Sequence, residues 1–113
     1  MIKAIDVLNP SASTETLTAE YERASRILGQ AEVRTPFLLL QRSKIRQNLK
    51  RLSHSLPRVA IHYAIKSNNH PAVLEEVARA GHRFDISSYQ DLLLAVEAGG
   101  HAREQIHSHP IKS

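Results

Sequence analysis

Cysteine and tryptophan are absent from this 113-residue chain, and phenylalanine occurs only twice. Without cysteine the chain has no disulfide framework and no thiol nucleophile, which slightly favours a cytoplasmic location. So few aromatic rings offer little surface on which nucleic-acid bases can stack. No apolar run approaches the roughly 20 residues that a membrane span needs. We therefore expect a soluble, cytoplasmic globular protein that binds neither nucleic acid nor membrane.

The formal net charge of +4 does not change this expectation. Basic residues between positions 42 and 51 interleave with Ile45, Leu49, Leu52 and Leu56. The spacing of these four apolar residues predicts one stripe along a helix, so the positive charges fall on the solvated face.

Beyond residue 34 the chain alternates between segments typical of strands and of helices. We predict strands near residues 37–40, 59–65, 83–86 and 105–109, which recur about every 22 to 24 residues. Such repeated βα units predict an α/β fold with parallel strands, either an open sheet or part of a barrel. Upstream, Leu17 to Leu28 have the spacing of one further helix, which we expect to end at Gly29.

Capping residues mark the ends of the predicted helices. We expect Ser43 to cap the first helix after residue 34, and Pro71 to begin the second, which Gly81 then ends. Ser88 and Asp91 predict a capping box before the third helix. We assign Asp91 mainly to this capping.

The chain supplies about four βα units, whereas a complete (β/α)8 barrel has eight in about 250 residues. We predict an amino-terminal extension with one helix over residues 1–34 and a partial barrel over residues 35–113. A partial barrel leaves sheet edges and an apolar face uncovered. We therefore expect it to associate with a second copy, a complementary chain or the remainder of the barrel.

Three candidate site residues lie at the carboxyl ends of predicted strands: Lys66, Asp85 and His109. Lys66 is either a surface lysine with its stem packed, or an amine that forms an imine at a partly desolvated strand end. Asp85 either caps a turn or faces a cationic cofactor. His107 and His109 share one strand face, but no third ligand occurs at a recognisable spacing, so we expect no metal.

Four segments, "TPFLLL", "HYAIKSN", "FDISSYQDL" and "IHSHPIKS", resemble in order and spacing the motifs of one enzyme family. They are similar to the amino-terminal half of pyridoxal-phosphate-dependent decarboxylases of the ornithine and diaminopimelate type. That family has the fold-type III, alanine-racemase-like barrel, which is a TIM-type (β/α)8 barrel. The resemblance runs from about Thr35 to the last residue.

The resemblance implies roles for particular residues. Lys66 matches the lysine of the family's "YAVKAN" segment, which forms the internal aldimine with pyridoxal 5'-phosphate. Ala64, Asp85 and His109 fall where residues line the cofactor, whereas Asp91 stands where the family commonly has glutamate. The implied function is decarboxylation of a basic amino acid or related amino-carboxylate, in polyamine or amino-acid metabolism, by a homodimer.

Two other functions stay open at this point. One is a catalytically silent relative of the antizyme-inhibitor kind, which the retained Lys66 disfavours. Another is a racemase or small cofactor-carrying barrel of the same fold. The family's phosphate-binding segment and carboxyl-terminal domain come later than these residues, so we expect the chain to be an amino-terminal segment that is inactive alone. The substrate cannot be chosen from these residues.

Overall fold

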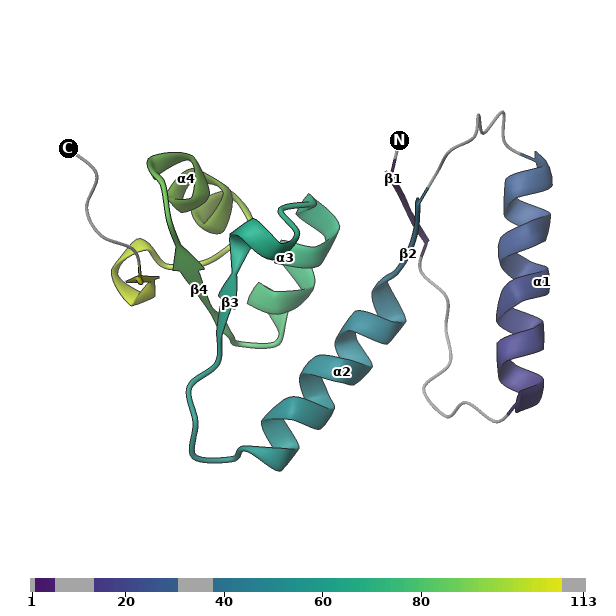
Figure 1. Cartoon of the computed structure of the whole chain (residues 1–113), viewed down its shortest axis with the longest axis horizontal. Helices are drawn as coiled ribbons and strands as arrows, with labels where there is room; N and C mark the ends of the chain where they lie inside the picture. The colour runs from purple at the N-terminus through teal and green to yellow at the C-terminus, as the bar shows by residue number, and fades with distance from the viewer. Residues whose placement is uncertain (1, 6–13, 31–37, 109–113) are drawn as a thin grey trace. The chain divides into compact units, whose positions relative to one another are not determined.

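The computed structural model describes residues 2–5, 14–30 and 38–108 (Figure 1). These residues form two compact units, residues 1–44 and 45–113. The first unit contains β1 (Ile2–Ile5), α1 (Thr14–Gln30) and β2 (Leu38–Gln41). The helix α2 (Arg42–Ser55) begins in the first unit and continues into the second. Those of the second are β3 (His62–Ala64), the 3-10 turn η1 (Ile65–Ser67), α3 (Pro71–Arg79), β4 (Arg83–Ile86), α4 (Tyr89–Glu97), the 3-10 turn η2 (Ala102–Glu104) and β5 (Ile106–His107).

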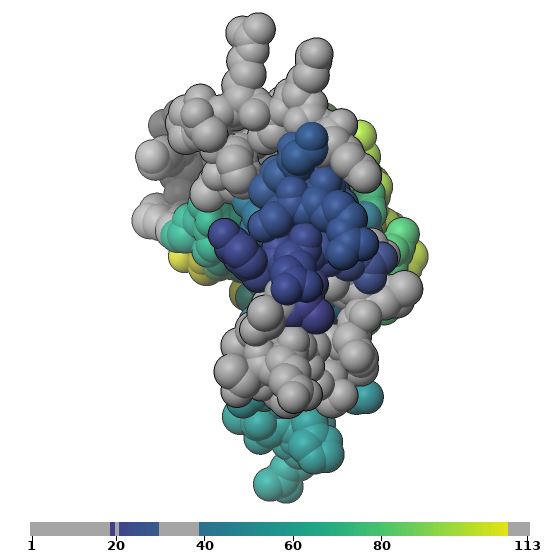
Figure 2. Space-filling view, turned by 90° about the vertical axis from the view of Figure 1, so that its right-hand side faces the viewer, coloured from purple at the N-terminus to yellow at the C-terminus, as the bar shows by residue number. Residues whose placement is uncertain are grey.

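The first unit is a strand, a helix and a parallel strand. β1 pairs with β2, and Ile2 lies opposite Leu38. The sequence did not predict β1, and α1 continues past Gly29 to Gln30 rather than ending at the glycine. Along α1, which is drawn in dark blue in Figure 2, Ala24 is buried whereas Tyr21 is 75% exposed. The predicted domain boundary after residue 34 lies outside the described residues.

The second unit contains the predicted parallel sheet. Its strand order is β3, β4, β5, with α3 and α4 as the connections, which confirms consecutive parallel βα units (Figure 1). β3 is shorter than predicted, because residues 58–61 are not in a strand and Val59 is 56% exposed. Within the described residues, β2 is hydrogen-bonded to β1 and not to β3, so the expected row of four strands is divided between two sheets.

The core of the second unit lies between the sheet and its helices. Phe84 of β4 is fully buried, and α3 contributes Leu74 and Val77 to the same core. Ile65 and Ala95 are also completely buried. Fully burying a side chain as large as Val77, Leu74, Ile65 or Phe84 stabilises the fold by roughly 1.5–3 kcal/mol. Val73, Leu74 and Val77 therefore form the buried apolar face of α3.

The helix ends agree with most of the predicted caps. α3 begins at Pro71, and Gly81 follows it with a φ of 75°, which favours glycine. The hydroxyl of Ser88 accepts a hydrogen bond from the amide of Asp91, as the predicted capping box requires. In a capping box, the side chain of Asp91 would also accept a hydrogen bond from the amide of Ser88. Here the Asp91 carboxylate instead accepts hydrogen bonds from the amide and hydroxyl of the preceding residue, Ser87. Ser43 is not a cap, since α2 already begins at Arg42.

We expect Gly100→Ala to destabilise the second unit. A Cβ atom at Gly100 would lie 2.8 Å from the carbonyl oxygen of Ala95 and 3.0 Å from the ring of Phe84, so the packed core would have to shift. We expect the free energy of unfolding to fall by about 1–3 kcal/mol, measured by urea denaturation. The control is Gly29→Ala, where no atom lies within 4 Å of the added Cβ. An equal effect of both substitutions would contradict this account.

We also expect the Asp91 cap to make stability depend on pH. Burial by itself raises the pKa of Asp91, but hydrogen bonds from Ser87 and Ser88 outweigh burial and leave the pKa lowered. A carboxylate with a lowered folded-state pKa contributes stability that is complete above its unfolded pKa, about 3.9, and is lost as pH falls through the folded value. Asp91→Asn should therefore flatten the acid limb of the unfolding profile.

The matched control for the pH experiment is Glu97→Gln, which removes an exposed carboxylate from the other end of α4. Glu97 makes no hydrogen bond or ion pair within the described part of the chain. Its substitution should leave the acid limb close to that of the unchanged chain. An acid limb that Asp91→Asn does not alter would show that this cap is not the source of the pH dependence.

Candidate functional site

The strand register brings two of the predicted site residues together. Ala64, the last residue of β3, is the direct register partner of Asp85 in β4. Successive side chains alternate between the two faces of a sheet, so Ala64 and Asp85 share the face opposite to that of Tyr63 and Phe84. Because Phe84 occupies the core, Ala64 and Asp85 lie on the sheet face that points away from this core.

Asp85 is held at the end of its strand by the residue that follows β5. One carboxylate oxygen accepts a 2.7 Å hydrogen bond from the hydroxyl of Ser108, and the other accepts a 3.3 Å bond from the Ser108 amide. Ser108 is two positions after Ile106, the register partner of Asp85, so both residues lie on one face. The two bonds fix the orientation of the carboxylate across neighbouring strands.

Lys66 lies in η1, the single 3-10 turn that directly follows β3. Its neighbour Ile65 is completely buried, whereas Lys66 itself is exposed. The hydroxyl of Tyr63 donates a 3.2 Å hydrogen bond to the carbonyl oxygen of Asn68, which spans the turn from one side to the other. Burial raises the pKa of Tyr63, so its hydroxyl stays protonated and can donate.

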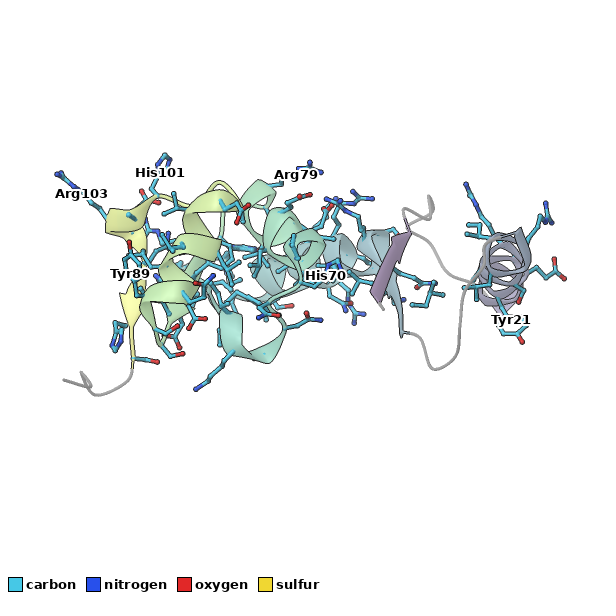
Figure 3. The ribbon with its side chains drawn as sticks, turned by 90° about the horizontal axis from the view of Figure 1, so that it is seen from above. Tyr21, His70, Arg79, Tyr89, His101 and Arg103 are labelled. Atoms are coloured by element: carbon cyan, nitrogen blue, oxygen red, sulfur yellow. The ribbon has the colours of Figure 1, made fainter. Side chains whose placement is uncertain are left out.

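The segment after Lys66 is joined to the start of α3 by two further hydrogen bonds. The side-chain oxygen of Asn68 accepts from the amide of His70 at 3.0 Å. The ring Nδ1 of His70 accepts from the amide of Ala72 at 3.2 Å, which makes His70 the N-cap of α3 (Figure 3). The turn that carries Lys66 is thus fixed by the strand before it and the helix after it.

The structure places Lys66, Ala64 and Asp85 at the carboxyl ends of adjacent strands, while His109 lies outside the described residues. Sequence reasoning missed Ser108 and Tyr63. The period-two spacing of Ile106 and Ser108 was a signal for Ser108. The hydrogen bond of Tyr63 depends on how tightly the following turn closes, which residue types alone do not reveal.

The described part of the chain contains no group of three histidine, cysteine, aspartate or glutamate side chains arranged to hold a metal ion. Over the same residues, no helix combines the length and the apolar character needed to cross a membrane.

Residues 42–113 match the family model described as "Pyridoxal-dependent decarboxylase, pyridoxal binding domain". The chain therefore belongs to this family, as its motifs predicted. This places the described βα units within the pyridoxal-binding domain of such decarboxylases.

The chain is also similar to individual members of the family. It is 32% identical over 78 residues to a lysine/ornithine decarboxylase from Selenomonas ruminantium, a match that covers 69% of this chain and 20% of that protein. It is 34% identical over 61 residues to an ornithine decarboxylase from Leishmania donovani, covering 54% of this chain and 9% of that protein. The chain thus spans about a fifth or less of the length of these two relatives.

A solved structure confirms the fold. The crystal structure of lysine/ornithine decarboxylase complexed with cadaverine from Vibrio vulnificus is similar with a TM-score of 0.70 and 33% sequence identity. The match covers 91% of this chain and 27% of that one. The described units therefore have the fold of part of a TIM-type barrel.

The donor groups of this site are suited to pyridoxal phosphate, the cofactor that the family implies. Lys66 offers a primary amine, the group that condenses with an aldehyde. Asp85 offers a carboxylate that Ser108 holds in one orientation, and Ala64 has only a methyl group on the shared face. An exposed amine and an oriented carboxylate at the carboxyl ends of adjacent strands fit a cofactor that carries an aldehyde and a cationic group.

We expect Asp85 and Ser108 to be energetically coupled. Ser108→Ala removes the 2.7 Å hydroxyl bond, which should lower the free energy of unfolding by about 0.5–1.5 kcal/mol. A double-mutant cycle with Asp85→Ala should give a coupling energy of the same size by chemical denaturation. The control cycle combines Asp85→Ala with Ser55→Ala, a substitution at the exposed end of α2. Additive effects in the Asp85 and Ser108 cycle would contradict the bond.

Proposed function

We propose that this chain is the Lys66-bearing segment of a pyridoxal-phosphate-dependent decarboxylase that acts on ornithine, lysine or a related basic amino acid. The observation that carries the proposal is the position of Lys66. Lys66 lies in the 3-10 turn that directly follows Ala64, the residue paired with Asp85, and it falls within the residues that match a pyridoxal-binding domain. Lysine/ornithine and ornithine decarboxylases among its relatives support the choice of substrate class.

Lys66 supplies the reactive amine in this proposal. An amine attacks an aldehyde only in its unprotonated form, so Lys66 must lose a proton before it can hold the cofactor covalently. The same amine is well placed to accept or return a proton near the reacting carbon. When bound, pyridoxal phosphate supplies an electron sink for the carbon-carbon bond that breaks. The turn fixed by Tyr63 and Asn68 keeps the Lys66 backbone in one position.

Asp85 orients cationic groups at the site. A negative charge at the end of β4 attracts a protonated amine, whether of Lys66 or of a substrate, and the two bonds from Ser108 fix the orientation of the carboxylate. Ala64 leaves space beside Asp85 because its side chain is a single methyl group. We assign His109, which lies outside the described residues, a cofactor-binding role on the resemblance of "IHSHPIKS" alone.

We further propose that the complete protein is a cytoplasmic homodimer, with a complementary carboxyl-terminal chain as the alternative partner. Two features support an association. β3 and β5 are the edge strands of the described three-stranded sheet, and unpaired edges favour added pairing. Leu93 and Val96 of α4 are 44% and 47% exposed, which adds apolar surface for a neighbour to cover.

Covalent labelling tests the role of Lys66. The chain is incubated with pyridoxal phosphate, reduced with borohydride and digested with trypsin. Modification of Lys66 blocks cleavage after that residue and yields a labelled peptide covering residues 59–79, which mass spectrometry identifies. Lys44 is also exposed and serves as the internal control for nonspecific labelling. We expect preferential labelling of Lys66, and none at this position in Lys66→Arg.

Turnover tests the proposed reaction. In the complete reading frame that carries these residues, Lys66→Ala should lower release of carbon dioxide from ornithine and lysine by at least about 100-fold, because it removes the amine that moves protons. Lys44→Ala is the matched control and should retain activity. Equal labelling of Lys44 and Lys66, or full activity of Lys66→Ala, would overturn the assignment.

A further inference from the structure

A second concave site lies on the helical side of the second unit, away from Lys66. A cavity of about 400 Å³ is lined by Arg46, Lys50, Ser53, Glu76, Arg79, Ala80 and His82. This volume falls within the range of pockets that bind small molecules. No residue of the Lys66 site lines it.

The topology places this cavity at the opposite ends of the strands. His82 directly precedes β4, and Arg79 and Ala80 end α3, the helix that leads into it. Lys66 and Asp85, in contrast, lie at the carboxyl ends of β3 and β4. The cavity is therefore separate from the site proposed to hold the cofactor.

One helix supplies a polar face to the cavity. Arg46, Lys50 and Ser53 are four and three residues apart on α2, so they lie along one side of it. Ser53 donates its hydroxyl hydrogen to the carbonyl oxygen of Leu49 at 2.9 Å. The Ser53 hydroxyl also lies 3.0 Å from His82 Nε2, within hydrogen-bonding distance, so it connects α2 to the residue that precedes β4.

The charge of the lining is positive. Glu76 is only 1% exposed, and its carboxylate lies 3.3 Å from the guanidinium of Arg46 and 3.6 Å from that of Arg79. Arg46, Lys50 and Arg79 line the cavity together with one carboxylate, which gives the lining a formal excess of two positive charges. Glu75, which is not part of the lining, also lies 3.9 Å from Arg79. The side chain of Lys50 makes no ion pair or hydrogen bond within the part of the chain that the structure describes.

We propose that this cavity binds a small dianion of the phosphate class, either free phosphate or a phosphomonoester. A phosphate ester carries a charge of about −1.5 to −2 at neutral pH, which matches the excess of the lining. Guanidinium groups and lysine ammonium groups are the side chains that most often bind phosphate oxygens. Glu76 holds the two guanidinium groups beside the cavity, so they need little reorganisation to bind (Figure 3 shows Arg79 extending from α3).

Titration calorimetry of the 113-residue chain at constant ionic strength tests the proposal, because it requires no cofactor and no turnover. The probes are inorganic phosphate and glycerol phosphate, with acetate as the monoanion control. We expect saturable binding of the phosphate probes and none of acetate. Tighter binding of glycerol phosphate would identify an esterified ligand, and equal binding would identify free phosphate; either result supports the site.

Two variants on α2 make the test specific. Lys50→Gln should weaken phosphate binding about three- to tenfold, because it removes one exposed ionic contact. Arg51→Gln removes the same charge from the adjacent position, which does not line the cavity, and should bind as the unchanged chain does. Lys50→Arg should retain affinity. Circular dichroism confirms that each variant is folded.

Two results would overturn the proposal. The first is that neither phosphate probe binds saturably to the folded chain. The second is that Lys50→Gln and Arg51→Gln weaken binding equally, since this shows that the probes respond to overall charge and not to the cavity. Neither result bears on Lys66, whose labelling is measured independently.

Discussion

The parallel register of β3, β4 and β5 is the constraint on which the candidate site depends. It aligns Ala64 with Asp85 and Asp85 with Ile106, so that residues paired across the three strands point to the same face of the sheet. One set, which includes Phe84, packs into the core, and the other set faces away from it. A slip of one residue in β4 would exchange Phe84 and Asp85, burying a carboxylate and exposing a large ring. The burial of Phe84 therefore also determines where the Asp85 carboxylate lies.

Much of the second unit could be predicted from the sequence because its signals are local. The periodicity of Val73, Leu74 and Val77 indicates a buried helix face, and Pro71 and Gly81 mark the limits of that helix. Lys66 and Asp85 could be placed at strand ends by the same reasoning. What could not be predicted depends on partners distant in the sequence. The separate pairing of β2 with β1 and the bonds from Ser108 to Asp85 are set by tertiary contacts that residue types do not specify.

Glu76 illustrates this limit most clearly. Its position in an amphipathic helix suggests an ordinary charged residue, yet it is 1% exposed and pairs with Arg46, 30 residues earlier. Removing a carboxylate from water costs several kcal/mol, and pairing with arginine offsets that cost only when the geometry is good. Such a pair is weak evidence for stability, but it restricts how α2 can pack on α3, since other packings would leave the buried carboxylate with Arg79 as its remaining ion-pair partner. The cavity beside Glu76 follows from this restriction.

The 3-10 turn explains how a lysine can be both anchored and exposed at the end of a half-buried strand. Had β3 continued through Lys66, the side chain would be directed by the pleat of the sheet and by its neighbours on β4. The chain leaves the sheet at Ala64 instead, and buried Ile65 fixes the start of the turn while Lys66 reaches solvent. The bond from Tyr63 to Asn68 then closes the turn from the far side. An amine on a backbone held at both sides loses less conformational freedom when it binds a ligand than an amine on a mobile loop.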